Sequence, residues 1–405
     1  MVRKKNNKAL CLLNFSGRFG GAEKRYATLF NRLMEQQRDY YLIINSCLYT
    51  ILTDSSVLKP NERIILFRDG KDFNSSAVGS KPLRKTNQKK SKLRLFLGRW
   101  KYFLKTTLLW VRFSRFFVGV IKNNRINTLY GVWQGGIWTW MWCRLLGVRL
   151  IFSVNGSGFL NTETNITRFF DSQYHVLKHA NVLDFLSPSL KVDYIRRMGK
   201  KINGSCVVTP NSFIDYTHYY PVFPKKPWVV FLGRLEPIKN PMVFMEAVKE
   251  IELTQSEMEV SFYVMGTGSM LGAMQQFASQ NNLKKVIFTG LHPHPWEILR
   301  VSSVFVSLQR DENYPSQSLI EAMACENAVI VTDVGDTRQL VTEKEGVLVQ
   351  DDPAQVAHNI VKLLMDEDLR KQKGQCARQK VLDNHTLDRF VLWYDNLMSG
   401  AFNFS

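Results

Sequence analysis

The sequence predicts an α/β protein built from two doubly wound parallel sheets. Short runs rich in β-branched and aromatic residues alternate with helical segments along the chain, which is typical of parallel sheets covered by helices. The chain has 405 residues and is 45% hydrophobic, so it exceeds the usual size of one hydrophobic core. We therefore expect two Rossmann-like domains.

The predicted strands form two series, separated by a proline-containing linker at 216–226. We expect an N-terminal domain at 1–215 with a basic insertion at 70–118, and a C-terminal domain at 222–385. A last helix at 386–405 is expected to pack back on the N-terminal domain. The first series is Ala9–Phe15, Tyr41–Asn45, Arg63–Phe67, Thr128–Val132, Arg149–Val154, Val182–Ser187 and Cys206–Thr209, and the second is Val229–Leu232, Ser261–Met265, Val286–Thr289, Val304–Leu308, Val329–Thr332 and Val347–Val349. Ligands of such sheets bind outside the carboxyl ends of the strands.

The formal charge of +19 is concentrated in one segment, because 73–162 contains sixteen Lys and Arg residues and no Asp or Glu. Such a basic helix, rich in Leu, Phe, Trp and Tyr, suits an anionic membrane surface, where each basic residue contributes about 1 kcal/mol. We expect segment 81–118 to contact the membrane. The alternatives are a solvated face of a docked helix and nucleic acid, which no nucleic-acid-binding motif supports. Five basic residues share one helical stripe: Arg94, Lys101, Lys105, Arg112 and Arg115.

Cysteine spacing and apolar runs indicate the compartment. The six cysteines lie far apart without a C-x-x-C pair, which fits neither a zinc site nor a disulfide framework. The apolar run Ala9–Leu13 is too short for a secretory signal, and polar residues interrupt the longest apolar stretch, Ile126–Cys143. We expect a cytoplasmic protein, peripheral on the inner face of the cell membrane.

Two turns that follow predicted strands carry candidate anion-binding residues. Gly20 and Gly21 lie before a helix, where glycines let backbone N–H groups approach an anion, although a tight βα turn explains them equally well. In the turn Gly233–Pro241, Arg234 and Lys239 can project over the positive end of the next helix. Two cations at such a place match a diphosphate.

Two helix starts give further signals. After the basic turn, Asn240 is expected as the N-cap and Pro241 as the first helical residue. Farther along, Ser316 or Ser318 is expected to cap a second helix and to leave N–H groups for phosphate or sugar oxygens. Glu321 then lies one turn into that helix. Its carboxylate suits a hydroxyl pair such as a ribose diol, whereas a glutamate favoured by the helix dipole is the alternative.

Taken together, these motifs resemble those of the GT-B glycosyltransferases with a Glu-x7-Glu signature. The resemblance is strongest from Thr209 to Asp352 and thinner in the first domain. The matching segments are Gly20–Glu23, Val154–Gly156, Pro210–Asp215, Phe231–Arg234, Lys239–Pro241, Gly266–Gly268, Phe288–Gly290, Glu321–Ala324 and Val331–Gly335.

The resemblance implies sugar transfer with retention from a UDP- or GDP-linked sugar, with no obligatory metal and no other cofactor. It implies that Arg234 and Lys239 bind the diphosphate, that Glu321 binds the ribose and that the base lies near 288–291. Stabilising the leaving diphosphate would then supply most of the catalysis. Other donor contacts are expected from Gly20, Gly21, Asn155, Gly233, Gly266, Gly268, Thr289, Ser316, Gln317 and Ser318.

Two positions on the sugar-facing side depart from the family pattern. Asn313 stands eight positions before Glu321, where the first signature Glu is expected, with Glu312 beside it. Either Glu312 reaches the sugar through a one-residue bulge or Asn313 replaces the carboxylate. Asn155 stands where many relatives have a His near the donor sugar.

The leading hypothesis is a hexosyltransferase-type enzyme that extends a surface polysaccharide on a glycan or lipid-linked glycan acceptor. The departures from the family pattern leave a catalytically silent GT-B binding or assembly subunit at the membrane as the alternative. A sugar-nucleotide epimerase is disfavoured, because it needs acid and base carboxylates in the first domain and the span 73–162 has none.

Overall fold

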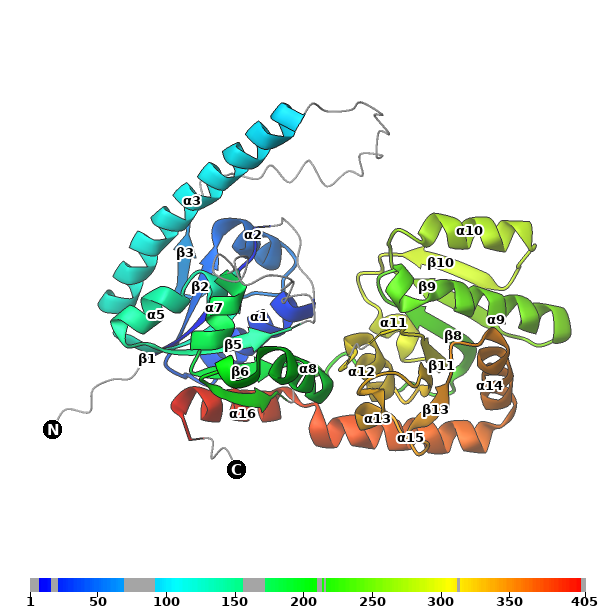
Figure 1. The fold of residues 1–405 in the computed structure, drawn as a ribbon. Coiled ribbons are helices and arrows are strands. Elements are labelled where there is room, and N and C mark those ends of the chain that lie inside the picture. Colours follow the sequence, from blue (N-terminus) through cyan, green and yellow to red (C-terminus); the bar gives the residue numbers. More distant parts are fainter. Residues whose placement is uncertain are drawn as a thin grey trace. The chain divides into compact units, whose positions relative to one another are not determined.

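The computed structural model describes residues 7–15, 21–68, 92–155, 172–209, 213–214, 216–311 and 314–401, with the backbone alone for 92–106. The chain divides into two compact units (Figure 1). The first unit comprises 1–185, 190–208 and 394–405, and the second comprises 186–189 and 209–393.

The first unit contains a seven-stranded parallel sheet in the order β3-β2-β1-β4-β5-β6-β7. The predicted strands are confirmed, with ends shifted by no more than two residues. The strands are β1 Asn7–Leu13, β2 Tyr40–Asn45, β3 Ile64–Phe67, β4 Ile126–Trp133, β5 Arg149–Val154, β6 Val182–Phe185 and β7 Ser205–Val208. The helices are α1 Gly21–Glu35, α2 Ser46–Asp54, α3 Lys92–Asn123, α4 Gln134–Ile137, α5 Trp140–Leu146, α7 Ser172–His179, α8 Pro188–Met198 and the 3-10 helix η3 Gly199–Lys201.

The second unit contains a six-stranded parallel sheet in the order β10-β9-β8-β11-β12-β13, again with the predicted strands. Its strands are β8 Lys226–Leu232, β9 Ser261–Met265, β10 Val286–Gly290, β11 Ser302–Ser307, β12 Ala328–Thr332 and β13 Gly346–Val349. Its helices are the 3-10 helix η4 Pro237–Lys239, α9 Pro241–Thr254, α10 Leu271–Gln280, α11 Trp296–Leu299, α12 Gln317–Ala324, α13 Thr337–Leu340, α14 Pro353–Met365 and α15 Glu367–Asn384. The last helix, α16 Leu387–Ser399, crosses the division between the units.

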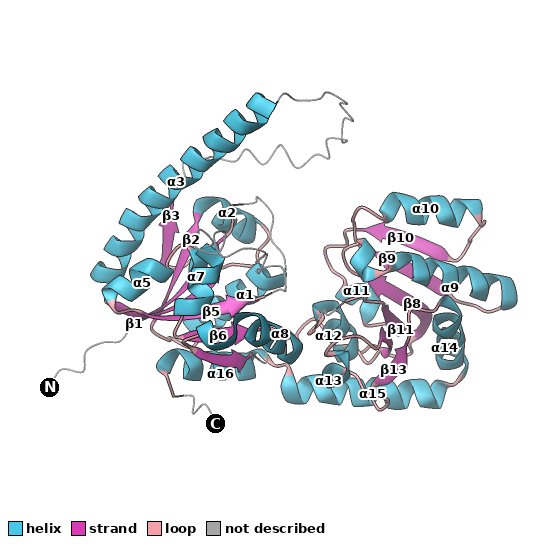
Figure 2. Ribbon diagram, viewed as in Figure 1, coloured by secondary structure: helices cyan, strands magenta, loops and turns pink. Residues whose placement is uncertain are grey.

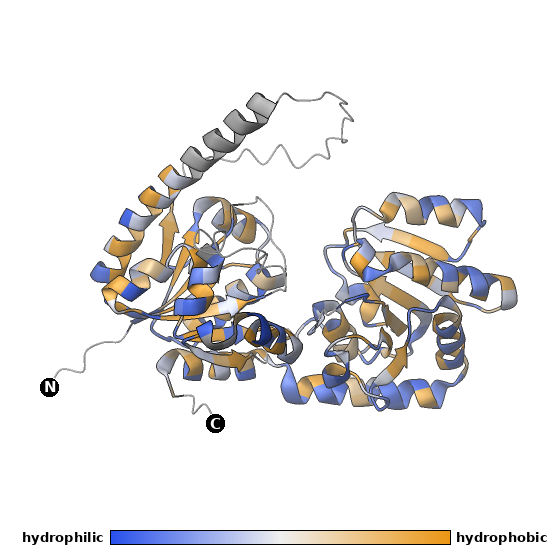
Figure 3. Cartoon of the chain, in the orientation of Figure 1, coloured by the Kyte–Doolittle hydropathy of each residue, from blue (hydrophilic) through white to orange (hydrophobic). Residues whose placement is uncertain are grey.

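Each sheet is buried between helices, which explains the continuous apolar runs in its strands (Figure 2). The residues of β11 and β12 are all buried, and so is the stretch Ala9–Leu13 of β1. Figure 3 shows apolar strands at the centre of each unit and polar residues on the outer helix faces. The fold class predicted from the sequence is therefore confirmed.

The strand order of each sheet reverses beside its first strand. In the second unit, β8 pairs with β9 on one side and with β11 on the other. The loops that follow β8 and β11 therefore leave adjacent strands at a switch point of the sheet. In open α/β sheets this is where ligands bind.

The helix predicted for the basic segment is present as the long helix α3. Its C-terminal part packs on the first sheet, because Phe113 and Phe117 are fully buried and Phe113 contacts Phe67 edge-on at 5.2 Å between ring centroids. The side chains of Arg94, Lys101 and Lys105 lie outside the described part of the structure, and so do residues 81–91 of the segment expected to contact the membrane. Within the described ranges, no helix combines the length and hydrophobicity that crossing a membrane requires.

Asp395, near the end of α16, is bonded to two strands of the first sheet and to Arg38, which precedes the second of them. It accepts hydrogen bonds from Lys8 Nζ at 2.6 Å and Tyr40 Oη at 2.6 Å, and it pairs with Arg38 at 3.0 Å. Burial raises the pKa of Asp395, but the bonds from Lys8 and Tyr40 outweigh burial, so the pKa lies below its ordinary value. The carboxylate therefore ties the end of the chain to β1 and β2.

Replacing Asp395 with Ala is expected to lower the stability of the first unit by about 2–3 kcal/mol, because Lys8 and Tyr40 lose a partly buried acceptor. Hydrogen exchange of the β1 and β2 amides measures this loss. Because the folded pKa is depressed, the contribution is present above the unfolded pKa of about 3.9 and disappears as pH falls through the folded value. Glu367→Ala, which breaks an exposed pair with Lys371, is the control. Equal protection in both variants would contradict the assignment.

Candidate functional site

The loop between β8 and α9 presents the two predicted cations. Arg234 is exposed and Lys239 is partly buried at the end of η4. Burial and then the charge of Arg234 lower the pKa of Lys239 to about 8, and no carboxylate of the described residues counters this. Arg234 has one acidic neighbour, Glu236 of the same loop, which it influences electrostatically while the Glu236 carboxylate accepts from Ser269 N and Oγ. The loop thus places two cations together, and of the two Lys239 has no acidic partner within the described part of the chain.

Glycines let the loops after β8, β9 and β10 approach one another closely. Gly266 has a φ of 135°, and a Cβ there would lie 1.9 Å from the carbonyl oxygen of Gly233. A Cβ on Gly268 would lie 2.3 Å from the carbonyl oxygen of Leu235. Backbone hydrogen bonds then lock the loops, from Gly233 N to Met265 O (3.0 Å), Leu235 N to Thr267 O (2.9 Å) and Gly266 N to Gly290 O (2.8 Å).

The start of α12 follows β11, the strand next to β8. Ser316 occupies the N-cap position, but the expected capping bond is wrong: its side chain makes none, and its Oγ lies 3.5 Å from that of Ser318 inside the helix. Glu321 lies one turn in, as predicted, and is only 6% exposed. Gln317 Nε2 donates both to Glu321 Oε1 and to the carbonyl oxygen of Phe213, each at 3.2 Å.

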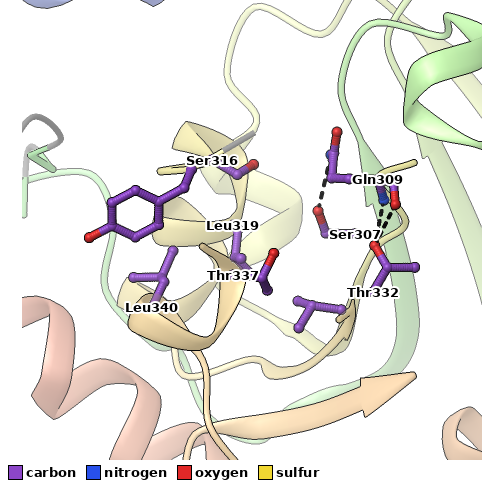
Figure 4. Close-up of a pocket in the computed structure, with 9 residues that line it drawn as sticks. Ser307, Gln309, Ser316, Leu319, Thr332, Thr337 and Leu340 are labelled. Atoms are coloured by element: carbon purple, nitrogen blue, oxygen red, sulfur yellow. Dashed lines mark hydrogen bonds between the residues drawn. The ribbon is translucent and has the colours of Figure 1, made fainter. Parts of the chain in front are cut away.

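A small pocket opens beside this helix start, at the carboxyl ends of β11 and β12 (Figure 4). Gln309 anchors the pocket, since its backbone N–H donates to Thr332 Oγ1 at 2.7 Å and its Nε2 donates to Ser307 Oγ at 3.4 Å. Gln309 Oε1 is buried and has no partner among the described residues. Of the residues that line the pocket, only Ser316 was predicted as a site residue. The polar residues at the ends of β11 and β12 were the sequence signal that could have revealed the others. The lining is Ser307, Gln309, Tyr314, Ser316, Leu319, Val331, Thr332, Thr337 and Leu340.

In the first unit, Asn155 directly follows β5 and begins a chain of hydrogen bonds between buried polar side chains, which sequence reasoning missed. Asn155 Nδ2 donates to Ser153 Oγ at 3.0 Å, and Ser153 Oγ lies 2.8 Å from Tyr26 Oη. Tyr26 Oη is 2.9 Å from Tyr130 Oη, which donates to Asp184. Burial raises the pKa of the Asp184 carboxyl to about 8. This row of hydrogen bonds fixes the side chain of Asn155 through residues that are distant in sequence.

The structure gathers most of the predicted donor contacts within the second unit. Gly233 follows β8 and precedes Arg234, Gly266 and Gly268 lie in the loop after β9 that contacts the β8 loop, and Thr289 lies in β10. Gly21, in the first unit, begins α1. Gly20, Glu312 and Asn313 lie outside the described residues, so the choice between the last two stays open. His292 and His294 follow β10, and the ring of His294 lies tilted against that of Trp296, with 4.7 Å between ring centroids.

Comparison with known proteins finds a sequence family whose model matches part of the second unit. Residues 226–366 match the family model described as Glycosyl transferases group 1. The chain is 24% identical over 172 residues to N-acetyl-alpha-D-glucosaminyl L-malate synthase of Bacillus anthracis, covering 42% of this chain and 44% of that protein. It is 26% identical over 206 residues to an alpha-1,4-N-acetyl-D-galactosaminyltransferase of Campylobacter jejuni whose name gives an undecaprenol-linked acceptor, covering 50% and 56%. The chain thus spans about half the length of these curated relatives.

Solved structures share the fold of the whole chain. Sucrose-phosphate synthase from Thermosynechococcus elongatus aligns with a TM-score of 0.71 at 18% identity, covering 98% of this chain and 99% of that one. Anabaena HepE in complex with UDP and glucose aligns with a TM-score of 0.71 at 14% identity, covering 97% and 100%. At these identities the likeness concerns the fold alone, which is the predicted GT-B class.

The low pKa of Lys239 predicts that binding of UDP or GDP weakens above pH 8. A diphosphate favours the charged amine and raises its pKa in the complex, so the affinity falls by up to about tenfold per pH unit between the free and bound values. The nucleotide phosphates are already ionised there, since their second pKa is about 6. Calorimetric titration across this range measures the effect. Lys239→Arg, which stays charged, should flatten the profile, and a flat wild-type profile would contradict the assignment.

Proposed function

We propose that the chain is a glycosyltransferase that uses a nucleotide diphosphate sugar, since residues 226–366 match the family model of group 1 glycosyl transferases. The observation that carries this proposal is the pair Arg234 and Lys239. Both cations lie at the switch point of the second sheet, and Lys239 is partly buried with no acidic partner within the described residues. A diphosphate would neutralise both charges and occupy the place where such sheets bind ligands.

The same pair accounts for the chemistry. Charge accumulates on the diphosphate as its bond to the sugar breaks, and cations held in place stabilise that charge without reorganising. Glu321 is buried one turn into α12, and Gln317 holds its carboxylate, so it suits a ribose diol. Transfer with retention of the anomeric configuration is part of the proposal, on the strength of the Glu-x7-Glu resemblance.

Assays with isolated membranes and a panel of radiolabelled UDP- and GDP-sugars test the activity. Arg234→Ala and Lys239→Ala are each expected to lower kcat/KM by about 10² or more, as expected for the loss of a charge-stabilising group. Arg338→Ala is the control, because Arg338 lies on α13 of the same unit in an exposed pair with Asp333. NMR of the product gives the anomeric configuration.

The outcomes separate the alternatives. Donor binding without transfer to any acceptor would favour a catalytically silent subunit. Donor affinity unaffected by both substitutions would contradict the proposed site. Inversion of the anomeric configuration would overturn the retaining mechanism alone.

We propose that the acceptor is a glycan or lipid-linked glycan and that the chain works on the cytoplasmic face of the membrane as a peripheral protein in surface polysaccharide synthesis. The Campylobacter relative supports this by its named acceptor. The first unit supports it by a surface of apolar and basic side chains. Leu108 on α3 and Leu145 on α5 are 66% and 68% exposed, and Arg112 and Arg115 lie exposed on α3.

The two helices that carry this surface pack together. Trp110 on α3 stacks on Trp142 of α5, with 6.4 Å between ring centroids, and Trp142 Nε1 donates to Ser114 at 2.9 Å. The exposed leucines therefore stand on a fixed part of the first unit. Exposed apolar side chains next to basic ones suit a lipid interface with anionic headgroups.

Reversing two charges on α3 is expected to weaken vesicle binding. The double variant Arg112→Glu and Arg115→Glu should lose about tenfold or more in affinity for phosphatidylcholine vesicles that contain phosphatidylglycerol, at about 1 kcal/mol per basic residue. The control, Arg196→Glu with Arg197→Glu, makes the same charge change on exposed residues of α8. Flotation assays measure binding, with vesicles of phosphatidylcholine alone as the reference. Equal losses in both variants would show that only net charge matters.

A further inference from the structure

Asn240 uses its side chain to join two distant loops instead of capping its helix. It stands at the N-cap of α9 with φ 53° and ψ 45°, is 1% exposed and makes no capping bond. Its Oδ1 accepts a hydrogen bond from Arg310 Nε at 3.1 Å, and its Nδ2 donates to Asp351 Oδ1. The predicted N-cap position is therefore right, whereas the capping role expected of such a side chain is not seen.

These contacts bring three segments of the second unit together. Arg310 follows β11, and its backbone N–H donates to the carbonyl oxygen of Ile238, the residue before Lys239, at 3.0 Å. Asp351 follows β13 and lies 3.9 Å from Arg310. Arg310 and Asp351 are both exposed, and an exposed pair at such a distance contributes little by itself. The buried side-chain amide of Asn240 therefore holds the two exposed side chains in place by hydrogen-bonding to both.

Lys239 needs such support. Its ammonium group is partly buried beside Arg234 and has no acidic partner in the described ranges. Desolvation and like charge both favour release of a flexible lysine side chain into water. Since Asn240 is the next residue, fixing its side chain fixes the backbone from which Lys239 extends.

We propose that Asn240, Arg310 and Asp351 form a clamp that positions Lys239 toward the diphosphate of the donor. All three are positioning residues, because they act through Lys239. The inference rests on the proposed function for the identity of the ligand, whereas the clamp itself can be tested without a ligand.

The variant Asn240→Gly removes the amide and keeps the backbone, because glycine adopts positive φ freely. Asp352→Ala is the matched control: Asp352 is the neighbour of Asp351, and its carboxylate accepts from Ala354 N at the start of α14. The intact, folded chain is labelled with an amine-specific reagent over a pH series. Mass spectrometry of its peptides then gives the extent of modification at Lys239.

Wild type and Asp352→Ala are expected to show a labelling midpoint near pH 8. In Asn240→Gly the midpoint should move toward the ordinary lysine value of about 10.4. Titration with UDP and with GDP follows, and Asn240→Gly should bind about tenfold more weakly than the control. Arg310→Ala and Asp351→Ala should each weaken binding, and the double variant should lose less than the sum of both free-energy changes.

An unchanged labelling profile in Asn240→Gly would overturn the clamp. A shifted profile with unchanged nucleotide affinity would overturn its role in donor binding. If the profile shifts but wild type binds neither nucleotide, the clamp stands and the proposed function fails, so the two failures are distinguishable.

Discussion

The close backbone contact between the loops after β8 and β9 is the constraint on which the candidate site depends. A side chain at Gly266 or Gly268 would meet a carbonyl oxygen of the β8 loop. Because both positions are glycine, the two loops pair through backbone hydrogen bonds. Gly233 N–H donates to the carbonyl oxygen of Met265, and Leu235 N–H donates to that of Thr267. The turn that carries Arg234 and Lys239 is therefore held by backbone atoms on one side.

On its other side, the turn meets the loops after β11 and β13 through Asn240. The free protein keeps a partly buried lysine beside a second cation, which disfavours the charged amine, and a bound anion would offset that cost. This is the physical link between the architecture and the proposed chemistry. The strand order supports it, because β8 and β11 are neighbours at the switch point and deliver both loops to one edge of the sheet.

Much of this could be predicted from the sequence. Buried parallel strands need continuous apolar runs, so β1 and β12 were visible as such, and the basic turn after β8 was visible because both cations lie within one short loop. Contacts between distant residues were not visible. Asn240 and Asp351 are separated by 111 positions, and Tyr130 and Asp184 by 54, and no local pattern signals either pair.

The central claim is that Arg234 and Lys239 grip a nucleoside diphosphate. The most direct measurement is a crystal structure of the chain with UDP or GDP. The account predicts diphosphate oxygens within hydrogen-bond distance of Lys239 Nζ and of the Arg234 guanidinium, at about 2.7–2.9 Å. A nucleotide bound elsewhere on the chain, with both side chains still in contact with solvent, would contradict it.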